Sequence, residues 1–218
     1  MWLRLDRIEW QAVPYRIGLA KPVFDDDVYA TLVTAFPHEA TLLSLGSGRG
    51  YNKWALSERV YVERYREYVQ ASPIWRELHA QIKSPDFVLM ATRAAGLPVG
   101  QYSSRWEFSS MPADGGFIVP HRDTPGKVLT LVVPMLQPGD WDETWGGGTD
   151  VLVPKPGIDA VDYVTPLDDF DVASTVHYRS NQACVFLRSE RSWHSVGPIR
   201  GPMGKWRRSL TINVERRR

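Results

Sequence analysis

The sequence has a single cysteine, Cys184, among its 218 residues. One cysteine cannot form an intramolecular disulfide, and it excludes a zinc site built from several cysteines. The chain also lacks an excess of charge, because 26 basic residues stand against 25 acidic ones. This near balance argues against bulk electrostatic binding to nucleic acid or to an anionic membrane, so we expect neither as a partner.

Long apolar runs are missing as well. No segment approaches the roughly 18 uninterrupted apolar residues that a membrane-spanning helix needs. The first ten residues carry charges throughout and contain no apolar stretch of the kind found in signal peptides. We therefore expect a soluble, cytoplasmic protein. The sequence indicates no oligomeric state.

The length fits one domain, 1–218, but the residue pattern changes near residue 100. Before this point the pattern is largely helical. Apolar spacing, capping residues and prolines predict helices over residues 25–36, 57–69 and 73–82. The glycine-rich and aromatic stretch 43–54 predicts a loop, in which Lys53 and Trp54 could contact a substrate.

After residue 100 the pattern consists of short strands separated by glycine and proline turns. Strands are predicted over residues 101–110, 117–119, 127–135, 149–153, 182–187 and 206–214, with an irregular stretch over 154–180. This spacing is typical of a jelly roll. The predicted fold class is therefore mainly β with helical support (α+β). A double-stranded β-helix over 101–215 would pack against the helical part, 1–100.

His121 and Asp123 are separated by one residue, so on extended backbone their side chains point to the same face. A neighbouring imidazole and carboxylate provide two thirds of the 2-His-1-carboxylate triad that holds non-haem Fe(II). His194, which follows the predicted strand 182–187, is the candidate third ligand. His177 is the alternative.

The last predicted strand has one polar and one apolar face. One face carries Arg207, Ser209, Thr211 and Asn213, and the other carries Arg208, Leu210, Ile212 and Val214. The polar row would suit a small anion inside a barrel, since the planar fork of arginine matches a carboxylate. An amphipathic strand with its polar side in solvent is an almost equally good interpretation.

In this order the motifs resemble those of the Fe(II)/2-oxoglutarate-dependent dioxygenases, and within them the prolyl-hydroxylase-like branch. The resemblance spans residues 101–215. It rests on His121-Arg-Asp123, the strand 128–133, Gly139-Asp-Trp-Asp with Trp145-Gly-Gly-Gly148, the strand 183–187 with Trp-His194-Ser-Val, and Arg207-x-Ser209-x-Thr211.

The resemblance implies that His121, Asp123 and His194 bind Fe(II), and that 2-oxoglutarate chelates the metal. The distal carboxylate of 2-oxoglutarate would pair with a basic residue on the last strand. Spacing allows Arg207 or Arg208, and the small polar residues that follow on the same face favour Arg207.

Ser209 and Thr211 would complete this 2-oxoglutarate site. Members of the family often place a tyrosine on the strand after the metal pair, which this chain lacks. Thr130, or a residue of the strand 101–110, would substitute for it.

The implied reaction uses O2 to hydroxylate an unactivated C–H bond of a small-molecule, sugar or peptidyl substrate, with release of succinate and CO2. Asp123 favours hydroxylation, because halogenating relatives lack this carboxylate. Candidate substrate contacts are Arg105, Glu107, Lys127, Lys53 and Trp54, each of which could instead form a surface ion pair. Alternative functions are a cupin-type metalloenzyme without 2-oxoglutarate, disfavoured by the missing His-x-His pattern, and a non-catalytic jelly-roll binding module.

Overall fold

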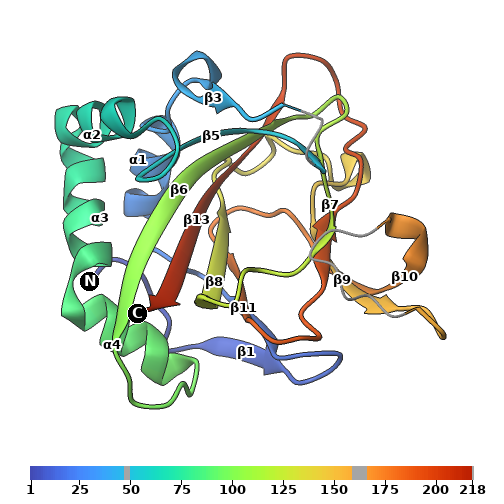
Figure 1. The fold of residues 1–218 in the computed structure, drawn as a ribbon. Coiled ribbons are helices and arrows are strands. Elements are labelled where there is room, and N and C mark those ends of the chain that lie inside the picture. The colour runs from blue at the N-terminus through green and yellow to red at the C-terminus, as the bar shows by residue number, and fades with distance from the viewer. Residues whose placement is uncertain (47–49, 159–165, 218) are drawn as a thin grey trace.

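The computed structural model describes residues 1–46, 50–158 and 166–217. Two antiparallel sheets face each other, and the helices lie along the outer face of the larger sheet (Figure 1). The α-helices are α1 (Asp26–Thr34), α2 (Val62–Ala71), α3 (Pro73–Lys83) and α4 (Pro85–Ala94). No helix in these ranges is long and apolar enough to cross a membrane.

The larger sheet has eight strands in the order β1-β2-β11-β8-β13-β6-β5-β3. Their bounds are β1 (Ile8–Gln11), β2 (Ile17–Ala20), β3 (Leu43–Ser44), β5 (Trp54–Ser57), β6 (Tyr102–Pro112), β8 (Lys127–Pro134), β11 (Ala183–Leu187) and β13 (Trp206–Arg216). The smaller sheet has the order β10-β9-β12-β7-β4. It comprises β4 (Tyr51–Asn52), β7 (Phe117–His121), β9 (Thr149–Pro154), β10 (Phe170–Val176) and β12 (His194–Val196). This confirms the predicted jelly roll with helical support.

The core between helices and larger sheet explains which face of each strand is buried. Trp106 and Phe108 of β6 and Leu210 and Ile212 of β13 are fully buried in this core. Trp75 of α3 stacks on Trp106 at 5.6 Å between ring centroids and meets Phe108 edge-on at 4.7 Å. Because side chains alternate along a strand, the polar residues of β6 and β13 must face the space between the two sheets.

The N-terminal part contains more strand than the sequence predicts. β1 and β2 pair as a hairpin, and β2 continues the larger sheet through β11. Ser57 ends β5 instead of starting a helix, so the predicted helix 57–69 begins only at Val62. These short segments depend on pairing with distant strands, which local residue patterns do not reveal.

Two further predictions of irregular structure need correction. The predicted loop 43–54 contains β3, β4 and the start of β5, and the predicted irregular stretch 154–180 contains β10. β10 pairs with β9 through a register shift between Val172 and Ser174, and a bulge of this kind obscures the alternation of a strand. Parts of both stretches, residues 47–49 and 159–165, lie outside the described residues.

Candidate metal centre

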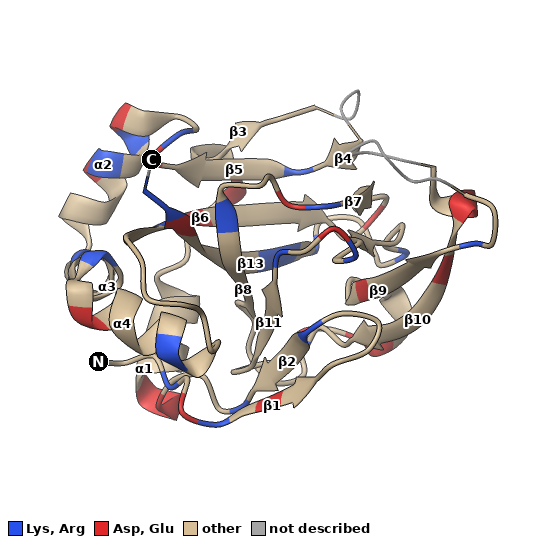
Figure 2. Ribbon diagram, turned by 60° about the horizontal axis from the view of Figure 1, so that its bottom comes forward, with Lys and Arg blue, Asp and Glu red and all other residues tan. Residues whose placement is uncertain are grey.

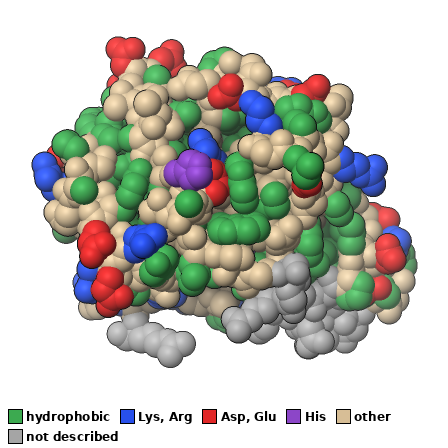
Figure 3. Space-filling view, turned by 90° about the horizontal axis from the view of Figure 1, so that it is seen from above, with side chains coloured by type: hydrophobic (Ala, Val, Ile, Leu, Met, Phe, Trp, Pro, Cys, Tyr) green, Lys and Arg blue, Asp and Glu red, His purple; other side chains and the backbone are tan. Residues whose placement is uncertain are grey.

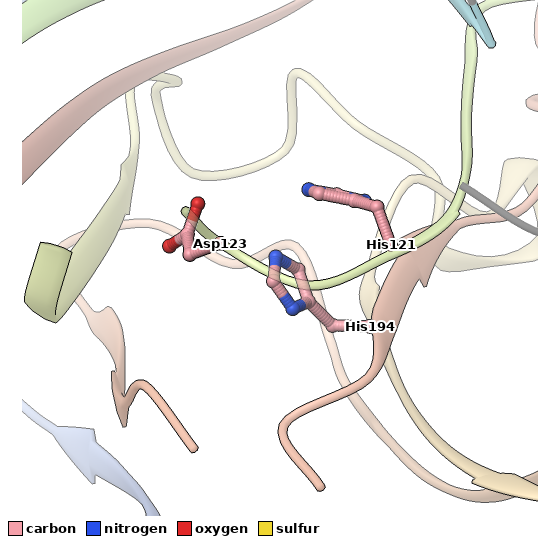
Figure 4. A group of neighbouring side chains, drawn as sticks. All are labelled: His121, Asp123 and His194. Atoms are coloured by element: carbon pink, nitrogen blue, oxygen red, sulfur yellow. The ribbon is translucent and has the colours of Figure 1, made fainter. Parts of the chain in front are cut away.

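Three side chains converge between the two sheets (Figure 4). His121 ends β7, Asp123 follows two residues later, and His194 begins β12 directly opposite His121 in the strand pairing. Each residue offers one ligand atom, and these atoms all lie within 4.8 Å of one another. The pairing of β7 with β12 therefore joins residues that are 73 positions apart in sequence.

Both histidines are oriented by the backbone. Nδ1 of His121 lies 3.0 Å from the carbonyl oxygen of Val119, and Nδ1 of His194 lies 3.0 Å from that of Ser192. A ring that donates its Nδ1–H to a carbonyl keeps the lone pair on Nε2, which is the common arrangement of metal-binding histidines. Burial, with the nearby His194, lowers the pKa of His121 to about 3, and burial also lowers the pKa of His194.

Asp123 is buried and held at both oxygens. Oδ1 lies 2.5 Å from Nζ of Lys127, and Oδ2 accepts a hydrogen bond of 2.6 Å from the hydroxyl of Thr130. Burial alone would raise the pKa of Asp123, but Lys127, His194 and Thr130 outweigh it and bring the pKa below its ordinary value. Two neutral imidazoles and one ionised carboxylate are the donor set that suits Fe(II).

A cavity of about 180 Å³ opens beside this triad. The polar row of β13 forms one wall, and His121, His194 and their neighbours in the smaller sheet face it. Its lining residues outside the triad include Arg207, Ser209, Thr211, Asn213, Thr130, Val132, Thr149, Phe186, Ile118, Lys53, Arg105, Glu107 and Lys127. The polar side of β13 thus faces the interior and not the solvent.

Arg207 is the buried cation of this cavity, with only 3% of its surface exposed. Its Nε donates to the carbonyl oxygen of Gly147 at 2.5 Å, and its guanidinium carbon lies 5.0 Å from the ring centre of Tyr178. Within the described ranges no carboxylate lies within ion-pair distance of Arg207. Because an unpaired buried charge is costly, this position favours a bound anion.

Arg208 points the other way. Its Nε and a terminal nitrogen donate to the two carboxylate oxygens of Glu39, at 2.6 and 3.0 Å. This fork-to-fork pair lies outside the cavity and ties β13 to the 3-10 helix at residues 39–41. The structure therefore separates the two arginines as the alternation of the strand predicts.

Thr130 contacts the carboxylate of the triad. Besides its bond to Asp123, its hydroxyl oxygen lies 3.1 Å from Oδ1 of Asn213, its register partner on β13. Thr130 thus lines the cavity and is linked to the candidate metal centre through Asp123, and Ser209 and Thr211 line the same cavity between Arg207 and Asn213. Strand parity placed Asn213 in the polar row that would suit an anion, but Asn213 was not among the residues predicted to bind 2-oxoglutarate.

The predicted substrate contacts divide into two groups. Lys53, Arg105, Glu107 and Lys127 all line the cavity. Trp54 does not line it, and its ring packs edge-on against Trp206 at 5.0 Å. Lys53 and Trp54 are neighbours on extended backbone, so their side chains point to opposite faces.

His177, the alternative ligand, is not near the triad. Its side chain is more than half exposed, and its Nδ1 lies 3.6 Å from a carboxylate oxygen of Glu143. The described residues therefore place His194 and not His177 beside His121 and Asp123.

No protein-family model matches this chain, and no curated protein matches it in sequence. Solved structures do match it in fold. A prolyl-4-hydroxylase of Pseudomonas putida is 19% identical, with 92% of each chain covered and a TM-score of 0.53. The non-haem alpha-ketoglutarate-dependent epimerase SnoN from nogalamycin biosynthesis is 18% identical, with 92% of this chain and 76% of that chain covered and a TM-score of 0.58.

A third match is the collagen prolyl hydroxylase of Paramecium bursaria Chlorella virus-1 in its 2-oxoglutarate complex. It is 12% identical, with 92% of this chain and 96% of that chain covered and a TM-score of 0.51. The chain therefore has the fold of the prolyl hydroxylases and other 2-oxoglutarate-dependent enzymes.

Proposed function

We propose that this protein is an Fe(II)- and 2-oxoglutarate-dependent oxygenase that hydroxylates an unactivated C–H bond of its substrate. The observation that carries the proposal is one cavity with two features, the triad of His121, Asp123 and His194 and the unpaired buried guanidinium of Arg207. A metal site alone would fit many enzymes. The arginine adds a place for the distal carboxylate of 2-oxoglutarate.

His121, Asp123 and His194 would hold the iron, which supplies activation of O2 together with oxidative decarboxylation of 2-oxoglutarate to succinate and CO2. The protein's own contribution is positioning and shielding. Arg207, fixed through Nε by Gly147, keeps its terminal nitrogens for the distal carboxylate. Ser209 and Thr211 line the wall beside it and provide hydroxyl donors.

The two alternative functions receive less support. A cupin-type enzyme without cosubstrate would leave the buried charge of Arg207 without a carboxylate partner among the described residues. A non-catalytic binding module would not require two histidines whose Nδ1 atoms are both held by backbone carbonyls. Both features follow directly if a metal and a dicarboxylate share the cavity.

Equilibrium binding without O2 tests this proposal. We expect the protein to bind one Fe(II), and to bind 2-oxoglutarate more tightly with the metal than without it. His121→Ala and His194→Ala should each weaken metal binding at least tenfold, in line with the loss of one ligand. His177→Ala is the matched control and should leave metal binding unchanged. Equal metal affinity in all four proteins would refute the proposed centre.

A further inference from the structure

The charged residues of the cavity are not balanced. Four of them are cationic, Lys53, Arg105, Lys127 and Arg207, and two are anionic, Glu107 and Asp123. If the proposed function holds, the two positive charges of a divalent metal are balanced by the two negative charges of 2-oxoglutarate. The cationic excess of the lining then remains for the substrate.

This excess belongs to the cavity and not to the surface as a whole. The chain carries a formal net charge of only +1. On the face seen from above, acidic and basic side chains are interspersed among apolar ones (Figure 3). Lys and Arg positions also occur on the central strands β6 and β13 (Figure 2). A ligand in the cavity therefore meets a different balance of charge from one on the outside.

Arg105 lies far from Arg207. It pairs in register with Asn213, which lies six positions after Arg207 on β13, so the two backbone positions are about 20 Å apart along the strand. A molecule of 2-oxoglutarate bound to both the metal and Arg207 leaves the Arg105 side of the cavity open. The cavity therefore has two separate cationic regions.

Arg105 is only partly neutralised. Its Nε donates to Oε1 of Glu215 at 2.7 Å, while the other oxygen of the same carboxylate accepts from Arg59 at 2.8 Å. The single negative charge of Glu215 is thus shared between the guanidinium groups of Arg105 and Arg59. Only Nε of Arg105 is used in this pair, which leaves terminal N–H donors for a further anion.

Lys53 brings a second cation to Glu107, which lies two residues from Arg105 on β6. Its Nζ lies 2.9 Å from Oε1 of Glu107, and the two side chains are only 18% and 14% exposed. An ammonium group has three donors, so one bond to Glu107 leaves two. Glu107 and Arg105 are two residues apart on β6 and face the cavity together.

We infer that the substrate is a small molecule bearing a carboxylate or a similar oxyanion, which Lys53 and Arg105 bind on the β6 side of the cavity. This inference rests on the proposed function. Glu107 holds Lys53 in place in the absence of substrate and competes with the substrate anion for it. Removing the charge of Glu107 should therefore strengthen binding of the anion.

Paramagnetic relaxation of ligand protons by protein-bound Mn(II) measures such binding even when it is weak. The protein is loaded with Mn(II) and saturated with 2-oxoglutarate. The probes are matched pairs: acetate with acetamide, butyrate with butyramide, benzoate with benzamide, and phenylacetate with phenylacetamide. We expect at least one acid to be relaxed at least fivefold more than its amide.

Variants then test the assigned residues. Lys53→Gln and Arg105→Gln should each reduce the preference for the acid to less than twofold, whereas Lys53→Arg and Arg105→Lys should retain most of it. Glu107→Gln should increase the affinity for the acid about threefold or more. The matched control is Lys205→Gln, because Lys205 is exposed and outside the cavity.

The outcomes separate this inference from the proposed function. If 2-oxoglutarate protons are not relaxed by Mn(II) in the wild-type protein, the proposed function fails and the inference fails with it. If 2-oxoglutarate is relaxed but no acid exceeds its amide, only the inference is overturned. An acid preference that persists in both Gln variants, or that falls in Glu107→Gln, also overturns it.

Discussion

Nζ of Lys127 lies 2.5 Å from Oδ1 of Asp123, the carboxylate of the candidate metal centre. The pair is largely buried and joins residues four positions apart, from the loop after β7 to the start of β8. In the metal-free protein the lysine compensates the charge of Asp123. A bound metal would compete with Lys127 for the same carboxylate and would be repelled by its ammonium group.

Replacing Lys127 separates its stabilisation of Asp123 in the metal-free protein from its competition with a bound metal. We expect Lys127→Met to lower the stability of the metal-free protein by about 1–3 kcal/mol, because a buried carboxylate loses its charged partner. The same change should tighten Mn(II) binding by about three- to tenfold, since a positive charge near the metal is removed. Thermal unfolding with a chelator and Mn(II) titration measure these effects, with Lys205→Met as control. Weaker Mn(II) binding by Lys127→Met would contradict the claim that Lys127 competes with the metal for Asp123.

The two adjacent arginines of β13 should differ sharply in function. Arg207→Gln should weaken 2-oxoglutarate binding by about 30-fold or more, as expected when one partner of a buried charge pair is lost. Arg208→Gln removes the same charge one residue away, yet it should change this affinity less than twofold because Arg208 pairs with Glu39. The dissociation constant of 2-oxoglutarate, measured with Mn(II), checks the difference. Equal losses of 2-oxoglutarate affinity in the two variants would contradict the assignment of Arg207 to the distal carboxylate.

Gly147 positions Arg207 and leaves little room for a side chain. Its φ is +85°, and an added Cβ would lie 3.1 Å from Cζ2 of Trp141 and 3.3 Å from Cδ of Arg207. We expect Gly147→Ala to destabilise the fold by about 1–2 kcal/mol through the left-handed backbone, and also to weaken 2-oxoglutarate binding. Gly139→Ala is the control, because Gly139 has the same φ with nothing within 4 Å. The Gly139→Ala variant should be destabilised but should bind 2-oxoglutarate as tightly as the wild type.

The pair of Glu39 and Arg208 predicts a dependence of stability on pH. Burial raises the pKa of Glu39, but the hydrogen bonds and charge of Arg208 outweigh it, and the pKa lies below its ordinary value of 4.5. Just below pH 4.5 the folded state therefore binds fewer protons than the unfolded state. The ionised Glu39 gives its full contribution to the free energy of unfolding above pH 4.5, and this contribution is lost as the pH falls through the folded pKa.

Glu39→Gln should lower the free energy of unfolding at pH 7 by about 1–2 kcal/mol, a modest loss because Arg208 is one third exposed. The variant should lose less stability than the wild type when the pH is lowered from 6 to 4. Denaturant unfolding at these two pH values measures the difference. An identical pH dependence in both proteins would show that Glu39 is not stabilised by Arg208.

Much of this cavity follows from local sequence rules. Alternation along a strand places Arg207, Ser209 and Thr211 on one face, and the structure shows this face inside the cavity. The same rule applies at Lys53 and Trp54, but residues 43–54 were predicted as a loop in which both side chains could contact a substrate. The strands there are only two to four residues long, too short for a periodic signal.

What the sequence could not predict depends on contacts between distant segments. The strand pairing that sets His194 opposite His121 and the sharing of Glu215 by Arg59 and Arg105 both join distant parts of the chain. Such contacts are set by sheet order and register, which a single sequence does not specify. The β10 strand escaped prediction for the same reason, since its pairing with β9 contains a bulge.

The most direct test of the account is O2-dependent release of succinate from 2-oxoglutarate by the Fe(II)-loaded protein, compared between the wild type and Asp123→Ala. We expect measurable turnover in the wild type, even without substrate, and at least a 100-fold loss in Asp123→Ala, with His177→Ala retaining wild-type turnover. Wild-type protein that releases no succinate above a metal-free control, or Asp123→Ala turnover equal to the wild type, would contradict the account.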